Sequence, residues 1–510
     1  MDKQNYASRL CGARTQSQRV ALTADWILRN FDGFYSEFLS IPDSAKRAFE
    51  AQDHAESIRL SRRRISMYSQ AIHEMGPFIN AVLPQFAVRQ SWWDEIERLY
   101  LKSIEGRYEA DLAFAFMLSV RRMVYRGEWR PVEYSYGRAG EMVSEQPAAI
   151  TRAFGAMPRL DAGIVAKVLK LPGFTVDYEN LEEDAARVAA RANQEFGLDK
   201  EGGTGIEELD VVEGGFYRNR GAYIVGRVRL GDDSIRPLII ALLNRDSGIY
   251  VDALITTERD AHNLFSSTLA NFHVTTVYYH ELNTFLYSIM PHRKLGLHYS
   301  TVGYNHMGKV AVINEIKEEL ARDDARFEIS VGFRGTVAIG FSGPTSDYNL
   351  KVIRNHPTAG YKWGKFEGIE RVMEKYDRVH EINRTGSMLD NIIYYNIELE
   401  EDLFAPELLE ELLSEAGETV SLQDRSVVFK YLIVQPRLTP LLVFLENAEP
   451  ADAATAIVNL GDCIKNNAAA NIFNKDLDAR NYGVSHFLKV YLFDYDAVEP
   501  LEIVKVRTNV

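Results

Sequence analysis

The chain has 510 residues, of which 46% are apolar and 25% charged, and its net charge at pH 7 is −14. At roughly 100–200 residues per domain this length predicts about two to four domains with sizeable cores, and the acidic balance argues against nucleic acid as the main partner. The two cysteines, Cys11 and Cys463, exclude a disulfide framework or a cysteine-based zinc site. The apolar runs are too short to cross a membrane, and the first 19 residues lack the apolar core of a signal peptide. We therefore expect a cytoplasmic protein without a membrane partner.

Residues from about 20 to 205 show the periodicity of helices. In the stretch TADWILRNFDGFYSEFLSI, large apolar side chains recur every three or four residues and form one stripe, comprising Trp26, Ile27, Phe31, Phe34, Tyr35 and Phe38. Thr23 precedes this stripe and is the predicted N-cap. We interpret the stripe as helix–helix core; an aromatic ligand pocket is the alternative.

The sequence pattern changes from helical periodicity to β-rich runs after the glycines at 202, 203 and 205. Residues 206–260 contain three β-rich runs separated by the turn sequences GDDS and RDSG, which predict an antiparallel meander. Residues 261–320 are mixed. We therefore expect one domain over 1–320, mostly helical with a small antiparallel sheet.

A second series of elements begins near residue 321. The pattern predicts strands around the glycine-containing segment SVGFRGT, a strand with Lys351, a charged helix, a strand ending in YLIVQPR, and a helix over the region 451–473. The segment NIFNKDLDARNYGV follows, with Asp476 and Asn481 five residues apart, and Asp494 lies thirteen residues further on.

This order matches the parts that phosphoryl transfer from ATP requires. A glycine loop lets backbone approach the phosphates, a lysine supplies a cation, and an Asp-x-x-x-x-Asn loop with a later Asp orients the acceptor hydroxyl and holds Mg²⁺. Each motif alone is weak, because glycine turns, strand lysines and this spacing are common; the ordered set is the stronger signal. The candidates are a catalytic Asp476, metal ligands Asn481 and Asp494, and a nucleotide site formed by Ser330, Val331, Gly332, Phe333, Arg334, Gly335, Thr336 and Lys351.

Three assignments stay open at this point. Glu370 or Glu374 pairs with Lys351, as in kinases, or both glutamates face solvent on a charged helix. YLIVQPR forms the hinge beside the adenine or is a plain strand end, and Asp496 assists the metal or caps its turn.

Several segments together resemble the bacterial isocitrate dehydrogenase kinase/phosphatase (AceK) family. They are NIFNKDLDARNYGV, YLFDYDAVE, LKVIR, EKYDRVHEIN, ILRNFDGFYSEFLSIPDSAKRAFEAQDH, and FYRNRGAYIVGRVRL with GIYVDALITT. The resemblance runs through nearly the whole chain. It implies an α+β protein with a helical regulatory domain over 1–320 and a bilobal protein-kinase-like domain over 321–510, with a shortened C-lobe.

The resemblance also implies the activity. Members of this family phosphorylate a serine of isocitrate dehydrogenase with ATP and Mg²⁺, or Mn²⁺, and remove the same phosphate, which controls flux between the tricarboxylic acid cycle and the glyoxylate bypass. AMP is implied as an allosteric effector, and a homodimer is left open. The family's ATP loop, nucleotide lysine, catalytic Asp and metal ligands fall on the candidates given above.

The chain departs from the family pattern in three places. Arg384 replaces an aspartate that the family uses for dephosphorylation, so we expect impaired phosphatase activity, and Arg480 replaces a lysine before Asn481. The chain also ends soon after Asp494. These departures favour one rival interpretation, a non-catalytic relative that binds nucleotide or isocitrate dehydrogenase and regulates by contact. A second rival is a kinase of small molecules, because such enzymes share the Asp-x-x-x-x-Asn loop and the metal-binding Asp.

Overall fold

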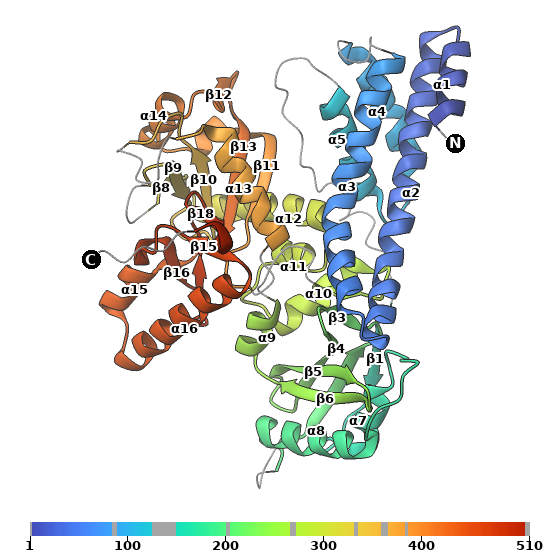
Figure 1. Cartoon of the computed structure of the whole chain (residues 1–510), viewed down its shortest axis with the longest axis vertical. Coiled ribbons are helices and arrows are strands. Elements are labelled where there is room, and N and C mark those ends of the chain that lie inside the picture. The colour runs from blue at the N-terminus through green and yellow to red at the C-terminus, as the bar shows by residue number, and fades with distance from the viewer. Residues whose placement is uncertain are drawn as a thin grey trace. The chain divides into compact units, whose positions relative to one another are not determined.

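The structure is a computed structural model, and it describes residues 3–83, 89–124, 149–199, 204–265, 272–330, 335–358, 366–382 and 386–504. The chain divides into two compact units (Figure 1). The first contains the described residues up to Gly308, and the second contains those from Lys309 onward. Within the described ranges, no helix is both long and apolar enough to cross a bilayer.

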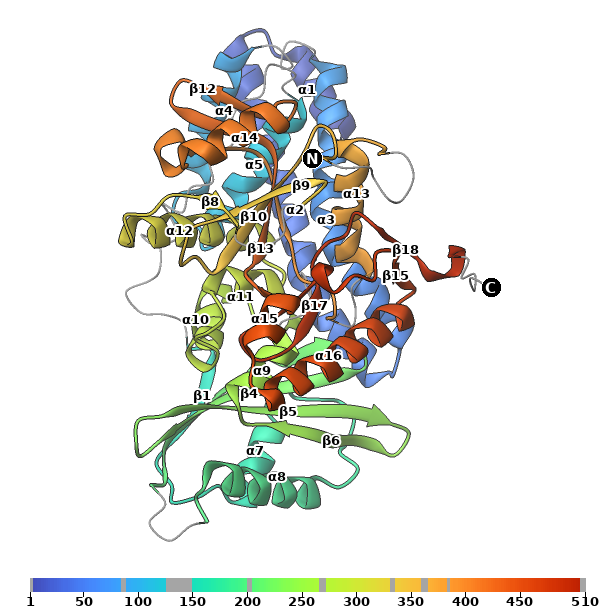
Figure 2. The same ribbon diagram turned by 90° about the vertical axis from the view of Figure 1, so that its left-hand side faces the viewer.

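The first unit begins with helices, of which two are long and lie side by side (Figures 1 and 2). The helices are α1 (Lys3–Gly12), α2 (Gln16–Glu50), α3 (His54–Val82), α4 (Gln90–Ile104) and α5 (Ala110–Val124). The aromatic stripe predicted from the sequence is buried along α2, from Trp26 to Phe38. It therefore forms helix–helix core rather than the wall of an open pocket.

The predicted N-cap of this helix is wrong. Thr15 caps α2: its side chain accepts from the backbone N–H of Gln18, and the Gln18 side chain accepts from the backbone of Thr15. Thr23 lies inside the helix, where its buried hydroxyl donates to the carbonyl of Arg19 at 2.8 Å. The reciprocal Thr15–Gln18 capping box satisfies two free N–H groups, so the helix starts eight residues earlier than the apolar stripe suggests.

The first unit also contains a seven-stranded sheet. Its strands are β1 (Thr151–Phe154), β2 (Ile206–Val212), β3 (Phe216–Arg218), β4 (Gly221–Leu230), β5 (Ile235–Arg245), β6 (Gly248–Ile255) and β7 (His273–Val274). Strands β2, β4, β5 and β6 pair antiparallel in the order β2-β4-β5-β6. The turn sequences predicted the part of this order formed by β4, β5 and β6. Figure 2 shows α8 (Leu181–Phe196) beneath β5 and β6, next to α7 (Ala162–Leu169).

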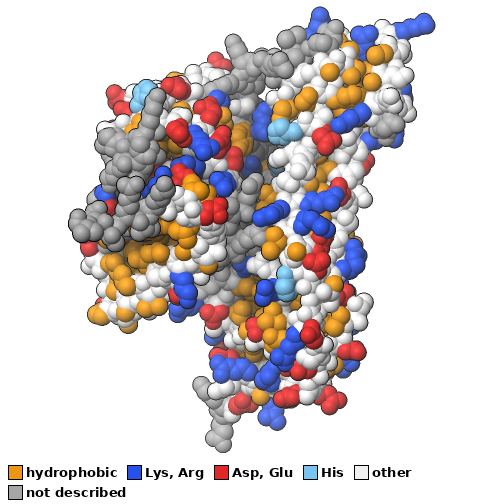
Figure 3. All heavy atoms as spheres, in the orientation of Figure 1, with side chains coloured by type: hydrophobic (Ala, Val, Ile, Leu, Met, Phe, Trp, Pro, Cys, Tyr) orange, Lys and Arg blue, Asp and Glu red, His pale blue; other side chains and the backbone are white. Residues whose placement is uncertain are grey.

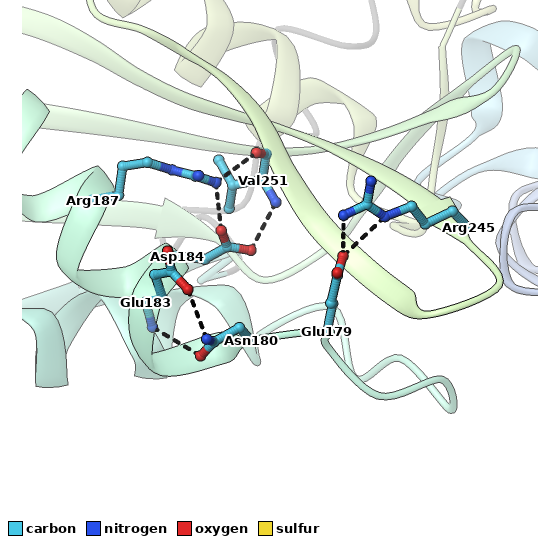
Figure 4. A network of polar contacts seen from close by, with 7 residues as sticks. All are labelled: Glu179, Asn180, Glu183, Asp184, Arg187, Arg245 and Val251. Atoms are coloured by element: carbon cyan, nitrogen blue, oxygen red, sulfur yellow. Dashed lines mark hydrogen bonds and ion pairs between the residues drawn. The ribbon is translucent and has the colours of Figure 1, made fainter.

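Polar contacts fasten α8 to the edge strand β6 (Figure 4). Asp184 accepts from the backbone N–H of Val251 at 2.9 Å and pairs with Arg187 at 2.5 Å. Asn180 caps the helix by accepting from the N–H of Glu183 at 3.2 Å. The buried edge of β6 thus has its donor satisfied by a side chain, which anchors the helix against the sheet.

Further helices lie along the chain between β6 and the strands of the second unit. They are α9 (Glu258–Phe265), α10 (Tyr279–Ile289), α11 (Leu295–Thr301) and α12 (Asn305–Arg322). The division between the two units falls after Gly308, inside α12.

In the second unit, a six-stranded antiparallel sheet follows α12. Its strands are β8 (Glu328–Ile329), β9 (Ala338–Ser342), β10 (Tyr348–Ile353), β11 (Ile392–Glu400), β12 (Val420–Gln423) and β13 (Ser426–Pro436), in the order β11-β13-β10-β9-β8 with β12 on β13. The helix α13 (Ile369–Ile382) shares a core cluster with Ile353 of β10 and Ile433 of β13. The turn η2 (Glu401–Leu403) and α14 (Pro406–Glu415) follow β11.

The remaining elements of the second unit follow β13 along the chain. They are β14 (Thr439–Pro440), α15 (Leu441–Asn447), α16 (Pro450–Ala469), β15 (Ile472–Asn474), η3 (Ala479–Asn481), β16 (Tyr482–Val484), β17 (Val490–Leu492), β18 (Val498–Pro500) and η4 (Leu501–Ile503). Strands β14, β16 and β17 form one small sheet, and β15 pairs with β18. The predicted α+β class is confirmed, with helices first and two sheet-bearing parts.

Helix α16 buries only a narrow stripe of its surface. Ala456, Cys463 and Asn467 are buried, whereas Ile457 and Val458 are exposed. On the face seen in Figure 3, acidic and basic side chains are interspersed, and apolar side chains gather over α15 and α16. The buried stripe is the one that packs toward β15 and β17 and thereby supports the segment between them.

Candidate active site

Lys351 projects from β10 toward the turn that contains Phe493 and Asp494. The residue is only 7% exposed, and its Nζ donates to the backbone carbonyl of Phe493 at 3.0 Å. Burial lowers the pKa of Lys351, while the nearby carboxylates of Asp494 and Asp496 act in the opposite direction. The lysine is therefore a buried cation held beside the turn that carries the predicted metal-binding aspartate.

The Asp-x-x-x-x-Asn segment is a loop closed by its own hydrogen bonds. It follows β15, where the side-chain oxygen of Asn474 accepts from the backbone N–H of Asp476 at 3.0 Å. Asn481 then donates its side-chain N–H to the carbonyl of Asp476 at 2.9 Å. The N–H of Phe493 donates to the carbonyl of Asn481 at 3.1 Å. Two hydrogen bonds thus connect Asp476, Asn481 and the residue preceding Asp494.

The carboxylates of this region influence one another. The pKa of Asp496 is raised to about 7, first by burial and then by Asp494, with a smaller contribution from Asp476, while Lys375 opposes the rise. Like charges that gather in a partly buried place disfavour ionisation, and a bound cation relieves that cost. The structure therefore brings Asp476, Asp494 and Asp496 within electrostatic reach of one another.

The donors here suit a hard divalent cation. In the described part of the chain, no three His, Cys, Asp or Glu residues already form a metal cluster. Mg²⁺, however, is usually held by one or two carboxylates together with waters and substrate phosphates, so a complete protein cage is not needed. Asp494 and the side-chain amide of Asn481 offer oxygens of the preferred kind. The residues present thus fit such an ion bound together with a nucleotide.

The glycine loop is described only at its two ends, since Val331, Gly332, Phe333 and Arg334 lie outside the described residues. At one end, the Ser330 hydroxyl donates to the side-chain oxygen of Asn349 at 2.5 Å. At the other, a Cβ on Gly335 would lie 2.6 Å from the carbonyl oxygen of Ala338. Only glycine avoids that backbone clash, which explains the residue type at position 335. Thr336 accepts from the backbone N–H of Thr358 at 3.0 Å.

Arg354, which was not predicted from the sequence, holds the Gly335 end of the glycine loop. Its side chain is buried, and its Nε donates to the carbonyl of Gly335 at 3.4 Å. The guanidinium also pairs with Glu411 of α14 at 2.5 Å and approaches Glu415 at 3.5 Å. A buried arginine with two carboxylates nearby is well compensated, so this ion pair ties the loop to α14.

The predicted alternative that α13 offers a glutamate to Lys351 is wrong. Glu370 pairs with Lys430 at 3.3 Å, and Glu374 pairs with Arg371 at 2.6 Å. Both glutamates are largely exposed, which is the other interpretation given above. Lys351 is instead satisfied by the backbone of Phe493.

Of the two arginines that depart from the family pattern, the structure describes Arg480 and does not describe Arg384. Arg384 lies outside the described residues. Arg480 folds back onto Asp478, with its Nε 2.9 Å from the carboxylate oxygen, and this contact raises the pKa of Arg480. Asp478 also accepts from the backbone N–H of Arg480 at 3.0 Å and so caps η3.

Two further groups at the turn were missed. Gln435 is 2% exposed, and its side-chain N–H donates to the carbonyl of Phe493 at 3.3 Å, next to Lys351. A single amide near the end of the apolar strand SVVFKYLIVQP was the signal that could have identified it. The carbonyl of Phe493 itself carries no such signal, because every residue has one.

The order of these parts along the chain is that of a protein-kinase-like domain, in which a lysine from the sheet meets a loop and a turn from the following layer. Two family profiles match this chain. The one described as "Isocitrate dehydrogenase kinase/phosphatase (AceK), regulatory domain" covers residues 24–324, and the one described as "Isocitrate dehydrogenase kinase/phosphatase (AceK) kinase domain" covers residues 325–509. The chain therefore belongs to the isocitrate dehydrogenase kinase/phosphatase family, and the resemblance drawn from the motifs is confirmed.

Individual relatives agree with the profiles. Proteins named isocitrate dehydrogenase kinase/phosphatase from Rhodopseudomonas palustris strains BisB5 and TIE-1 are 48% and 47% identical to this chain. Each alignment covers 96% of this chain and 81% of the relative. A protein of the same name from Anaeromyxobacter sp. strain Fw109-5 is 30% identical over 479 residues, which is 94% of this chain and 82% of the relative.

Proposed function

We propose that this chain transfers phosphate from ATP to a serine of isocitrate dehydrogenase and removes the same phosphate, and so controls flux between the tricarboxylic acid cycle and the glyoxylate bypass. The observation that carries the proposal is the meeting at one turn of Lys351, through the carbonyl of Phe493, and of the Asp476–Asn481 loop, through the N–H of Phe493. In this proposal residues 321–510 perform the chemistry and residues 1–320 regulate it.

Each residue has a defined part in the reaction. Asp476 orients the serine hydroxyl and accepts its proton, because its carboxylate stands on a loop whose backbone is held by Asn474 and Asn481. Lys351 uses one of its three N–H donors on Phe493, which leaves the ammonium charge and further donors for the nucleotide phosphates. Positioning and charge stabilisation then supply most of the rate.

Asn481 and Asp494 are the residues that would hold Mg²⁺ or Mn²⁺. A bound divalent cation would neutralise charge on the phosphate oxygens. The neighbourhood of Asp476, Asp494 and Asp496 favours such a cation, because positive charge would relieve the cost of ionising the partly buried Asp496 carboxyl beside the other two.

The finer features of the proposal come from the family resemblance. AMP is the allosteric effector, ATP binds at Ser330–Thr336 and Lys351, and a homodimer stays open. The low cysteine content, rather than the resemblance, favours the cytoplasm as the protein's location. Dephosphorylation uses the same site with water as the acceptor. It is impaired in this chain, because Arg384 places a cation where the family has a carboxylate.

The decisive experiment incubates the purified chain with isocitrate dehydrogenase and radiolabelled ATP, with and without AMP. Asp476→Ala should lower phosphate transfer by at least about 100-fold, because the general base is removed, while ATP binding persists. The matched control is Asp462→Ala, which removes an exposed carboxylate from α16 in the same unit. Full activity of Asp476→Ala would refute the assignment.

Two other outcomes separate the rival activities. ATP-dependent thermal stabilisation without any phosphate transfer would identify a nucleotide-binding regulator instead of an enzyme. Label that appears in a small metabolite, with none in protein, would identify a small-molecule kinase. A phosphate-release assay with phosphorylated isocitrate dehydrogenase then measures the second activity, and undiminished release would contradict the effect assigned to Arg384.

A further inference from the structure

Helix α13 reaches the turn at residues 494–496 through Tyr376. This side chain is 1% exposed, and its hydroxyl donates to Oδ1 of Asp494 at 3.2 Å. Its ring packs against the ring of Tyr495, with centroids 5.0 Å apart. Burial, and next the charges of Asp494 and Asp496, raise the pKa of Tyr376 well above its usual value, so the hydroxyl keeps its proton and acts as a donor.

The preceding residue holds the backbone of the same turn. The Nζ of Lys375 donates to the carbonyl of Asp496 at 2.5 Å and lies 3.6 Å from Glu499. Lys475, next to Asp476, approaches the same glutamate at 3.2 Å. Adjacent helical residues point about 100° apart, so Tyr376 and Lys375 contact the turn from two directions.

These contacts replace the link that kinases usually make between this helix and the strand lysine. Glu370 and Glu374 pair with other cations and do not contact Lys351. The described polar contacts of α13 with the site therefore run to the aspartate turn and not to Lys351.

We propose that Tyr376 is a positioning residue for Asp494: its hydroxyl fixes one oxygen of that carboxylate and thereby sets the affinity of the turn for the divalent cation that accompanies the nucleotide. Lys375 supports the same turn through its backbone. The proposal rests on the assignment of Asp494 to the metal in the proposed function. It adds a contact between α13 and the proposed metal ligand that does not pass through Lys351.

The alternative role for Tyr376 is purely structural, since its ring belongs to the core cluster of the second unit. Tyr376→Phe separates the two roles, because it keeps the ring and removes only the hydroxyl. Tyr395→Phe is the matched control: the Tyr395 hydroxyl also donates to a carboxylate, that of Asp377, at 3.2 Å, and Tyr395 packs against the same cluster.

The first measurement is the binding of a fluorescent ATP analogue to the full chain as Mg²⁺ is titrated, and again in EDTA. Groups that orient a metal ligand change metal affinity by about 10- to 100-fold when removed, so Tyr376→Phe should raise the half-saturating Mg²⁺ concentration by about 10-fold. Affinity in EDTA should stay within about twofold, and Tyr395→Phe should change neither quantity. An unchanged Mg²⁺ dependence, or an equal loss with and without metal, would overturn the proposal.

The second measurement needs neither nucleotide nor catalysis. Hydrogen exchange of the ligand-free chain should be faster at the amides of residues 494–498 in Tyr376→Phe and in Lys375→Met, with no change in Tyr395→Phe. Unaltered exchange in Tyr376→Phe would also overturn the proposal. If the wild-type chain phosphorylates isocitrate dehydrogenase while Tyr376→Phe behaves like the control, the positioning role fails and the proposed function stands. If the wild-type chain transfers no phosphate but both shifts appear, the proposed function fails and the positioning role stands.

Discussion

The side-chain amide of Asn481 donates to the backbone carbonyl of Asp476 at 2.9 Å. The residue proposed to hold the metal therefore also closes the loop that presents the proposed base. One side chain couples two functions, and substitutions at position 481 can separate them.

We predict that Asn481→Asp retains an oxygen ligand for the metal but loses the donor to Asp476. A lost hydrogen bond in a partly buried site costs about 1–3 kcal/mol, so kcat for phosphorylation should fall about 10-fold. The half-saturating Mg²⁺ concentration should not rise, because the new carboxylate also attracts the cation. Asn481→Ala should impair both quantities. The measurement is the initial rate against Mg²⁺ concentration for each variant.

Asn459→Asp is the control for this pair. Asn459 makes the same type of bond, from its side-chain N–H to the carbonyl of Thr455 at 2.9 Å, but on α16. Wild-type kinetics are expected for Asn459→Asp. Identical kinetics in Asn481→Asp and Asn481→Ala would show that the hydrogen bond and the metal contact are not separable.

A second prediction concerns the buried cation of Lys351. Lys351→Met removes the charge but preserves length and apolar packing. Asp494 and Asp496 then lose a nearby cation, and removal of one partner from a buried group of charges lowers stability. We expect phosphate transfer to fall by about 100-fold or more, as when other transition-state charge contacts are removed, when it is measured well below the lowered unfolding midpoint of the variant.

Lys430→Met provides the comparison, since Lys430 is a strand lysine of the neighbouring β13 that pairs with the exposed Glu370. Its activity should remain near the wild-type rate. Activity of Lys351→Met above about a tenth of the wild type would remove the lysine from the nucleotide site.

The glycine at position 335 gives a third prediction. A Cβ there would lie 2.6 Å from the carbonyl oxygen of Ala338, which belongs to the backbone and cannot swing away. Gly335→Ala should displace the end of the loop and raise the Kd for ATP by about 10-fold, which corresponds to about 1.4 kcal/mol. Isothermal titration with an ATP analogue measures this change.

Gly461→Ala is the opposite case. Gly461 lies inside α16, and nothing stands within 4 Å of the position of an added Cβ. Alanine there should stabilise the second unit by about 0.5–1 kcal/mol without any effect on ATP binding. Equal ATP affinities in Gly335→Ala and the wild type would show that the loop does not contact the nucleotide closely.

Sequence patterns indicated candidate residues that stand close together in one loop, and they missed contacts between distant segments. Asp476 and Asn481 became candidates because their spacing within one loop is itself the chemical requirement of the proposed reaction. Tyr376 could not, because an aromatic residue on the apolar face of a helix reads as core, and its hydroxyl bond to Asp494 spans 118 residues. The carbonyl of Phe493, which accepts from Lys351 and Gln435, has no sequence signature at all.

For the fold too, elements with a local sequence signal were predicted better than elements without one. The turn sequences GDDS and RDSG between apolar runs correctly predicted strands β4, β5 and β6, because hairpins are specified by neighbouring residues. The start of α2 was placed too late, because a polar first turn carries no apolar stripe and its capping box must be read from Thr15 and Gln18 instead.

The last prediction concerns acid stability of the first unit. His273 is fully buried, with its Nδ1 3.2 Å from Nη1 of Arg64 and its Nε2 3.1 Å from the hydroxyl of Ser61. Burial, and then the charge of Arg64, lower the pKa of His273 well below its usual value of 6.5. The histidine is therefore neutral in the folded chain, while the unfolded chain takes up a proton as the pH falls below about 6.5. Proton uptake by the unfolded state favours unfolding, so this residue contributes stability above that pH and loses it below, by about 1.4 kcal/mol per pH unit.

The free energy of unfolding of the first unit, obtained from urea unfolding monitored by hydrogen exchange in that unit, should show this slope between pH 7 and pH 5. His273→Gln, which cannot take up a proton, should reduce the slope by that amount, and His73→Gln, at an exposed position of α3, should leave the slope as it is. A slope that is the same in His273→Gln and in the wild type would mean that His273 is already protonated in the folded chain or stays neutral in both states.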